Sequence, residues 1–191
     1  IGIRSIEFRG ADGLYINGKP FGDKLMGVNR HQDYAYIGNA VPNNLHWLDV
    51  KKMRDAGFRI IRSAHYPQDP AFMDACDELG MFIIVATPGW QYWNPEPVFE
   101  ERILSDIRNM VRRDRNHPSV LLWEPVLNET AFPESFAQNA YRATHEEYPA
   151  PGCYAAIDDK SKGAMGYDVV YTAPKNEAFY RNAGKSCFTR E

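Results

Sequence analysis

The feature that most constrains this sequence is the regular alternation of short apolar runs with amphipathic helical segments. Such runs predict strands of a parallel sheet that helices cover on both faces. The expected strands are residues 24–29, 58–63, 81–86, 119–123, 153–157, 168–172 and 186–189. Seven strands in this order predict a (β/α)8 TIM barrel of the α/β class. Because a complete barrel takes about 250 residues, a chain of 191 residues is expected to be truncated after strand seven.

The helical segments between these strands have recognisable ends. Residues 69–79 are expected to form a helix, because Pro70 suits its first turn and Gly80 follows its end. A helix that begins near Asn44 is expected to end at Gly57. Its expected core-facing residues are Leu45, Leu48, Met53 and Ala56. The remaining helices are predicted for residues 98–114, 135–147 and 176–182.

The N-terminal segment has a different pattern. Ile6 and Phe8 alternate with polar residues, a turn bounded by two glycines follows at 10–13, and residues 14–16 form a second apolar stretch. This arrangement predicts a β-hairpin. We therefore expect residues 1–21 to be a hairpin lead-in from a preceding domain, and residues 22–191 to be the incomplete barrel.

Polar and aromatic side chains follow most of the expected strands. The catalytic groups of a βα barrel lie at the carboxyl ends of its strands, so these positions are candidates for a functional site. They are His31, His65, Trp90, Trp93, Asn128, Glu129, Tyr171 and Glu191. The aromatic rings can either pack within loops or cover the apolar face of a sugar.

Two of these candidates, Glu129 and Glu191, are carboxylates that follow strands four and seven, whose ends face each other across a barrel mouth. One carboxyl group of such a pair can protonate a glycosidic oxygen while the other attacks the sugar. A separation of about 5 to 5.5 Å retains the configuration, whereas about 6.5 to 9.5 Å admits a water and inverts it. The donor needs a raised pKa, and the nucleophile must stay ionised. Exposed loop glutamates are also common, so the residues alone leave both roles open.

Four motifs occur in barrel-like order along the chain. They are residues 27–31 (Gly-Val-Asn-Arg-His), 62–67 (Arg-Ser-Ala-His-Tyr-Pro), 77–80 (Asp-Glu-Leu-Gly) and 113–129, which begins Arg-Asp-Arg-Asn-His-Pro and ends Asn-Glu. Together they resemble glycoside hydrolase family 2, which includes β-galactosidases, β-glucuronidases and β-mannosidases. The resemblance implies that Asn128 contacts substrate, that Glu129 is the acid/base and that Glu191 is the nucleophile.

Other residues near the expected mouth have two possible roles. The candidate substrate-binding residues are Asn128, His65, His31, Tyr171 and Trp90. The histidines resemble family positions near sugar hydroxyls, and the alternative is that they bond within the top of the barrel. Arg62 is interpreted as structural, paired with a carboxylate at the mouth. Glu124 departs from the family's usual Trp-Ser pattern, and a structural role is preferred over a bond to a sugar hydroxyl.

Composition limits the partners that this chain can have. A net charge of −3 without a long basic run argues against nucleic acid, and no apolar stretch approaches the roughly 18 residues of a membrane span. Cys76, Cys153 and Cys187 lack metal-pair spacing and are expected to be buried thiols, which leaves a cytoplasmic or a periplasmic or extracellular location open. Asp158 and Asp159 could bind a cation, but two nearby lysines favour the interpretation that they form a solvated loop.

The leading hypothesis is a retaining exo-β-glycosidase that acts on a carbohydrate substrate, first of all β-galactosides, without a metal or other cofactor. β-Glucuronidase and β-mannosidase are alternatives, and the former needs a cation for the sugar carboxylate. A non-catalytic carbohydrate-binding barrel and a metal hydrolase that uses His31 and His65 are the other classes. Open sheet edges predict association, and the resemblance implies flanking β-sandwich domains.

Overall fold

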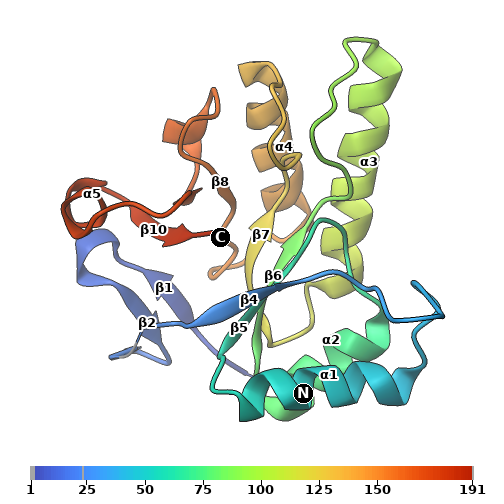
Figure 1. Ribbon diagram of the computed structural model, residues 1–191. Coiled ribbons are helices and arrows are strands. Elements are labelled where there is room, and N and C mark those ends of the chain that lie inside the picture. The colour runs from blue at the N-terminus through green and yellow to red at the C-terminus, as the bar shows by residue number, and fades with distance from the viewer. Residues whose placement is uncertain (1–2, 23, 191) are drawn as a thin grey trace.

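The computed structural model describes residues 3–22 and 24–190, in which seven parallel strands follow in the predicted order (Figure 1). One sheet has the order β4 (Gly27–Arg30), β5 (Ile60–Ser63), β6 (Phe82–Ala86) and β7 (Val120–Glu124). A second sheet contains β8 (Ala156–Asp158), β9 (Val169–Thr172) and β10 (Ser186–Thr189). A parallel bridge between Trp123 and Ala155 joins the two sheets. The predicted fold, a partial (β/α)8 barrel, is therefore confirmed.

Helices cover the outer side of these strands. They are α1 (Asn43–Asp55), α2 (Pro70–Leu79), α3 (Pro97–Asp114), α4 (Glu134–Glu147) and the short α5 (Glu177–Asn182). In Figure 1, α1 lies beside α2 and α3 beside α4. The predicted ends of α2 are confirmed: Ala71 N donates to the Asp69 carboxylate over 2.8 Å, and Gly80 closes the helix with a φ of 68°. Each helix within 3–22 and 24–190 is too short or too polar to cross a bilayer.

Helix α1 corrects the predicted core-facing side. His46 and Val50 are both 0% exposed, whereas Leu48 is 36% exposed. The buried Arg30 guanidinium explains this orientation. Its Nη2 donates to Asp49 over 2.9 Å and lies 3.3 Å from Nδ1 of His46. Because Arg30 is buried, the side of α1 that carries its partners His46 and Asp49 faces inward. The expectation that Leu48 faces the core is wrong.

The N-terminal lead-in is an antiparallel sheet at the start of the barrel strands. It contains β1 (Ile6–Phe8), β2 (Leu14–Ile16) and a third strand, β3 (Lys19–Pro20). The predicted hairpin is confirmed. Ile6 is 2% exposed and accepts a hydrogen bond from the Tyr154 hydroxyl at 3.1 Å. Arg4 donates to the carbonyls of Pro118 and Val120. The domain boundary between residues 1–21 and 22–191 stays a prediction.

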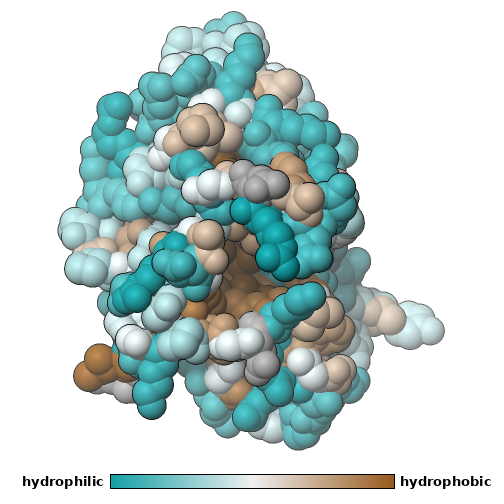
Figure 2. Space-filling model, turned by 90° about the vertical axis from the view of Figure 1, so that its left-hand side faces the viewer, coloured by the Kyte–Doolittle hydropathy of each residue, from teal (hydrophilic) through white to brown (hydrophobic). Residues whose placement is uncertain are grey.

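Strand residues alternate between two apolar environments. In β6, Ile83 and Val85 pack in a cluster that includes residues of the covering helices, whereas Ile84 packs with Ile6 and Tyr171 in an inner cluster. Figure 2 shows an apolar hollow on the face that carries β1, β10 and α5. Half-buried apolar residues packed against the inner cluster are Phe8, Leu14, Ile16, Leu25, Ile60, Phe82, Tyr154 and Phe188.

The two ends of the strand order approach each other at the carboxyl side. Within the described residues, β4 pairs only with β5, and β10 pairs only with β9. Nδ2 of Asn29, on β4, donates to the carbonyl of Arg190, just after β10, over 2.9 Å. The polar ends of the first and seventh strands therefore meet at one mouth, although their backbones do not pair.

The cysteines agree in part with prediction. Cys76 and Cys153 are buried thiols, and Cys187 is partly exposed. Burial raises the pKa of Cys153 to about 12. A thiol with so high a pKa is protonated at neutral pH and is a poor nucleophile.

Candidate active site

Two histidines and a tryptophan form a row at the carboxyl ends of β4, β5 and β6. His31 follows β4, His65 follows β5, and Trp90 lies in the loop after β6. The ring centroids of His31 and His65 are 5.7 Å apart, and those of His65 and Trp90 are 5.9 Å apart. Trp90 is 49% exposed, so its ring is open to solvent. The structure thus brings these three predicted residues together.

The loop after β7 places Asn128 and Glu129 beside this row. Asn128 is 3% exposed, whereas the side chain of Glu129 is 37% exposed. Glu129 has a φ of 48°, in the left-handed region that residues other than glycine rarely adopt. Such backbone geometry concentrates at functional sites. The turn places an exposed carboxylate directly after a buried amide.

Both oxygens of the Glu129 carboxylate accept hydrogen bonds. Gln91 Nε2 donates to Oε2 over 2.9 Å, and Arg190 Nη1 donates to Oε1 over 3.0 Å. The Gln91 hydrogen bond and then the Arg190 charge lower the pKa of Glu129, while partial burial opposes them. The expectation of a raised donor pKa is therefore wrong for this arrangement, because the carboxylate is solvated and both of its neighbours favour its charged form.

A second carboxylate, Glu124 at the end of β7, lies in a different environment. It is 0% exposed and accepts hydrogen bonds from Arg62 Nε at 2.8 Å and Nη2 at 2.5 Å. The same Nη2 donates to Asn128 Oδ1 over 2.9 Å, and Asn128 Nδ2 lies 3.5 Å from His65 Nε2. The predicted pairing of Arg62 with a carboxylate at the mouth is confirmed. Glu124 supports Asn128 through Arg62, because charge-assisted hydrogen bonds hold the guanidinium in place.

Tyr171, on β9, belongs to the interior. It is 1% exposed, and the Arg62 guanidinium lies 5.4 Å from the centroid of its ring. Burial, together with the nearby charge of Glu124, holds the pKa of Tyr171 well above its ordinary value. The ring thus lies beside the buried ion pair of Arg62 and Glu124, and the expected contact between Tyr171 and a sugar stays a prediction.

Most of the sequence matches a known family of enzymes. A family model described as the TIM barrel domain of glycosyl hydrolases family 2 matches residues 6–150. The chain belongs to glycosyl hydrolase family 2. The matched segment contains the row of rings, the buried ion pair and the loop that carries Glu129. The mouth described above is therefore part of a family 2 barrel domain.

Similar proteins support this membership. A β-galactosidase from Thermoanaerobacterium thermosulfurigenes is 38% identical over 78% of this chain and 20% of its own length. A putative β-glucuronidase from Formosa agariphila is 33% identical over 64% of this chain and 15% of its own length. The structure of a family 2 β-galacturonidase from Eisenbergiella tayi bound to galacturonate superposes with a TM-score of 0.81, at 27% identity, over 98% of this chain and 38% of that one. The chain spans about a fifth or less of the curated relatives.

The predicted nucleophile of this family 2 barrel, Glu191, lies outside the described residues. Its neighbour Arg190 is described and lies at the mouth. Arg190 N donates to the Thr172 carbonyl over 3.1 Å, and its guanidinium contacts Glu129. The residue that precedes Glu191 therefore touches the predicted acid/base.

The sequence analysis did not predict three residues that lie at the mouth: Gln91, Asp158 and Arg190. The sequence did contain a signal for Asp158, because it follows an apolar strand as the other candidates do, but neighbouring lysines favoured a solvated loop. That interpretation is wrong, since the Asp158 side chain is 17% exposed and lies 3.7 Å from Arg190. Burial raises the pKa of Asp158. A loop glutamine such as Gln91 gives no comparable signal.

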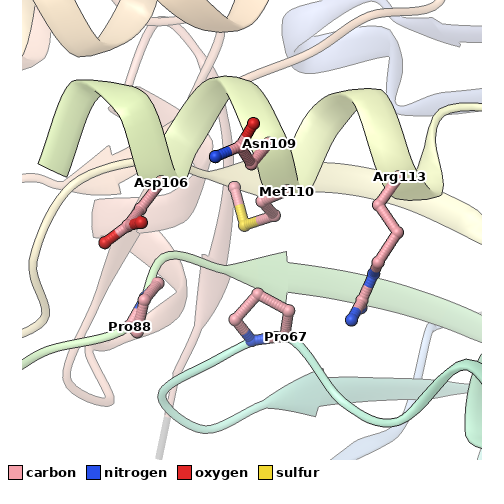
Figure 3. A pocket seen from close by; sticks show the side chains of 6 residues that line it. All are labelled: Pro67, Pro88, Asp106, Asn109, Met110 and Arg113. Atoms are coloured by element: carbon pink, nitrogen blue, oxygen red, sulfur yellow. The ribbon is translucent and has the colours of Figure 1, made fainter. Parts of the chain in front are cut away.

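Two further features involve other residues of these loops and of α3. Trp93 packs into the core, with ring centroids 5.4 Å from Phe99 and 4.8 Å from Phe136. A pocket of about 250 Å³ lies between α3 and the loops after β5 and β6 (Figure 3). Its lining residues are Pro67, Pro88, Asp106, Asn109, Met110 and Arg113.

Among the described residues, the His, Cys, Asp and Glu side chains form no group of three or more that could hold a metal ion.

Proposed function

We propose that this chain is the catalytic barrel of a retaining exo-β-glycosidase that releases terminal β-linked sugars, with β-galactosides as substrates. The observation that carries this proposal is the placement of Glu129. It is an exposed carboxylate on a strained turn at the end of β7, next to the buried amide of Asn128 and the rings of His65 and Trp90. β-Galactosidases among the similar proteins support the choice of sugar.

The proposed roles follow from exposure and position. Glu129 acts as acid and then as base, and Glu191 attacks the anomeric carbon. Asn128, His65 and His31 bind sugar hydroxyls, and the exposed ring of Trp90 stacks against the apolar face of a sugar. The buried Glu124 takes no direct part, because it is enclosed and already bound to Arg62.

The two halves of the reaction need different protonation states of Glu129, and its lowered pKa favours only one of them. In the first half, protonated Glu129 gives its proton to the leaving oxygen as Glu191 forms the glycosyl-enzyme bond. In the second half, ionised Glu129 takes a proton from the water that breaks this bond. The contacts with Gln91 and Arg190 favour the ionised form that the second half needs. We therefore expect proton delivery in the first half to be sensitive to these two contacts.

β-Glucuronidase is the second candidate, because Arg190 places a cation at the mouth. A putative β-glucuronidase is among the relatives. However, Arg190 lies 3.0 Å from Glu129 and 3.7 Å from Asp158, so two carboxylates already surround it. A uronate would bring a further negative charge to this group. A neutral sugar is therefore the preferred substrate, and β-mannosides are a third candidate to be assayed.

The proposal also includes partners other than the sugar. Strands β4 and β10 each present an edge to which another strand can bind, and Figure 2 shows an apolar hollow on the face that carries β10. We infer that the isolated chain associates through these edges, and that β-sandwich domains flank this barrel in the whole protein. The inference about the edges would be contradicted if analytical ultracentrifugation found the isolated chain monomeric and urea denaturation showed that this monomer unfolds cooperatively.

The central test is hydrolysis of aryl β-galactoside, β-glucuronide and β-mannoside by wild type, Glu129→Ala and Glu191→Ala. Both variants should lose activity. Added azide should give a β-glycosyl azide with Glu129→Ala and an α-glycosyl azide with Glu191→Ala, because azide replaces the missing group on opposite faces of the sugar. Full activity in either variant removes that residue from the proposal.

Two results would instead favour another class of function. If wild type binds galactosides but hydrolyses none of the three sugars, a non-catalytic carbohydrate-binding barrel replaces the enzyme. Activity that is lost with a chelator and restored by a metal ion would favour a metal hydrolase that uses His31 and His65. Retained activity in the chelator supports the two-carboxylate mechanism.

A further inference from the structure

The loop after β6 is attached to the loop that carries Glu129. Trp90 and Asn128 form a parallel β-bridge, and Gln91 N donates to the Asn128 carbonyl over 3.0 Å. Gly89 N, in the same loop, donates to the His65 carbonyl over 3.3 Å. Backbone hydrogen bonds therefore join three successive strand-end loops at the mouth. Gln91 lies where the second and third of these loops meet.

The Gln91 side chain adds a direct contact with the proposed acid/base. Its Nε2 donates to Glu129 Oε2 over 2.9 Å, while Arg190 binds the other oxygen. Both Gln91 and Glu129 have left-handed backbones, with φ of 58° and 48°. Such conformations are costly for residues other than glycine and persist where surrounding contacts impose them. Here each of the two strained residues contacts the other.

We propose that Gln91 is a positioning residue that orients the Glu129 carboxylate for proton transfer to the leaving oxygen. This inference rests on the proposed function, since it assigns a partner to the same acid/base. Arg190 alone binds one oxygen and leaves the carboxylate able to rotate about that contact. Gln91 binds the second oxygen and fixes the plane of the group. Its neutral amide does so without adding a charge to the mouth.

The charged groups around Glu129 come from its own strand, β7, and from three other strands. Arg190 follows β10, Asp158 ends β8 next to Arg190, His65 follows β5, and the buried pair of Glu124 with Arg62 lies on β7 and β5. Arg190 and His65 favour the ionised carboxylate, as the Gln91 hydrogen bond does. Removing the Gln91 amide therefore raises the pKa of Glu129 while these charges remain.

The test compares Gln91→Leu and Gln91→Gly with wild type on two β-galactosides. A dinitrophenyl galactoside leaves without proton assistance, whereas an alkyl galactoside needs it. General acid catalysis contributes about 10²–10⁴-fold. We expect a misoriented donor to lower kcat/KM for the alkyl substrate by about tenfold, and for the dinitrophenyl substrate by less than about twofold. The glycine variant relieves the strained backbone, so full activity in that variant would overturn the inference.

The matched control is Gln138→Leu. Gln138 is an exposed glutamine that donates to a glutamate, Glu134, over 3.3 Å on α4. This control should leave both rates unchanged. An equal loss with both substrates in the Gln91 variants would show a general structural defect and would overturn the positioning role.

A second readout needs no turnover. Titration of the Glu129 carboxyl carbon by NMR should give a higher pKa in Gln91→Leu than in wild type, because a hydrogen bond to the charged form is lost. An unchanged pKa would contradict the contact. If wild type hydrolyses no sugar, the proposed function fails, and this titration still decides whether Gln91 controls the carboxylate.

Discussion

Glu124 and Glu129 lie close together in sequence at the end of β7, and each binds an arginine, yet their surroundings are opposite. The side chains of Glu124 and Arg62 are 0% and 4% exposed. Those of Glu129 and Arg190 are 37% and 14% exposed. The buried carboxylate is enclosed by its partner and holds the framework. The exposed carboxylate keeps access to solvent and therefore to a substrate.

This difference shows that residue type does not assign a role in this mouth. A buried ion pair is expensive to disrupt, because a remaining charge stays in a poorly solvated place. An exposed ion pair contributes little to stability, because water screens it. Substitutions at Glu124 should therefore act on folding, and substitutions at Glu129 should act on catalysis.

The largest effect on stability is expected for Glu124→Ala. Removing this carboxylate from a buried guanidinium should lower the free energy of unfolding by about 3–5 kcal/mol. Urea denaturation followed by circular dichroism measures this quantity. Glu129→Ala is the matched comparison and should change it by less than about 0.5 kcal/mol. Similar values for the two variants would remove the contrast between the two carboxylates.

The next largest effect is on activity, in Glu129→Gln. This variant keeps the shape of the side chain but cannot donate a proton, so kcat/KM for an alkyl β-galactoside should fall about a hundredfold or more. Steady-state kinetics measures the loss. Glu101→Gln, at an exposed position of α3, is the control and should keep wild-type rates. A Glu129→Gln variant with wild-type rates would mean that another group delivers the proton.

A smaller change in stability is expected when both members of the buried pair are replaced. Arg62→Met with Glu124→Met removes both charges and fills the space with apolar atoms, so the double variant should recover most of the stability that Glu124→Ala loses. Its activity should nevertheless lie below that of wild type, because Asn128 loses its hydrogen bond from Arg62. Stability below that of Glu124→Ala would indicate that the pair itself is strongly stabilising.

The smallest effect, on the pH dependence of activity and on stability, is expected for Arg190→Gln. The guanidinium lowers the pKa of Glu129, so its loss should raise that pKa and move the alkaline limb of the kcat/KM profile to higher pH. The lowered pKa stabilises the fold only above the unfolded-state value, and this contribution disappears as pH falls through the folded-state value.

The stability change for Arg190→Gln should therefore be small at neutral pH, below about 1 kcal/mol, and smaller still in acid. Arg181→Gln removes an exposed arginine of α5 that pairs with Glu177 and serves as the control. An alkaline limb that stays in place in Arg190→Gln would show that Arg190 does not act on the protonation of Glu129.

Much of the fold was predictable, because local sequence carries the signals that start and end each element. Asp69 and Gly80 delimit α2 through their own hydrogen bonding and backbone geometry, and the apolar runs became the seven barrel strands. Which side of α1 faces the core was not predictable from the sequence. It depends on Arg30, which contacts His46 and Asp49 only after the chain folds.

The sequence by itself determined the order of strands and helices and the positions of His31, His65, Asn128 and Glu129 at strand ends, since each depends on neighbouring residues. Only the tertiary structure decided which of these groups are exposed and what they contact. Gln91 and Arg190 reach Glu129 from other loops, and the interior encloses Tyr171. Burial and charge depend on residues far apart in the chain, so the lowered pKa of Glu129 arises only when Gln91 and then Arg190 reach it from other loops.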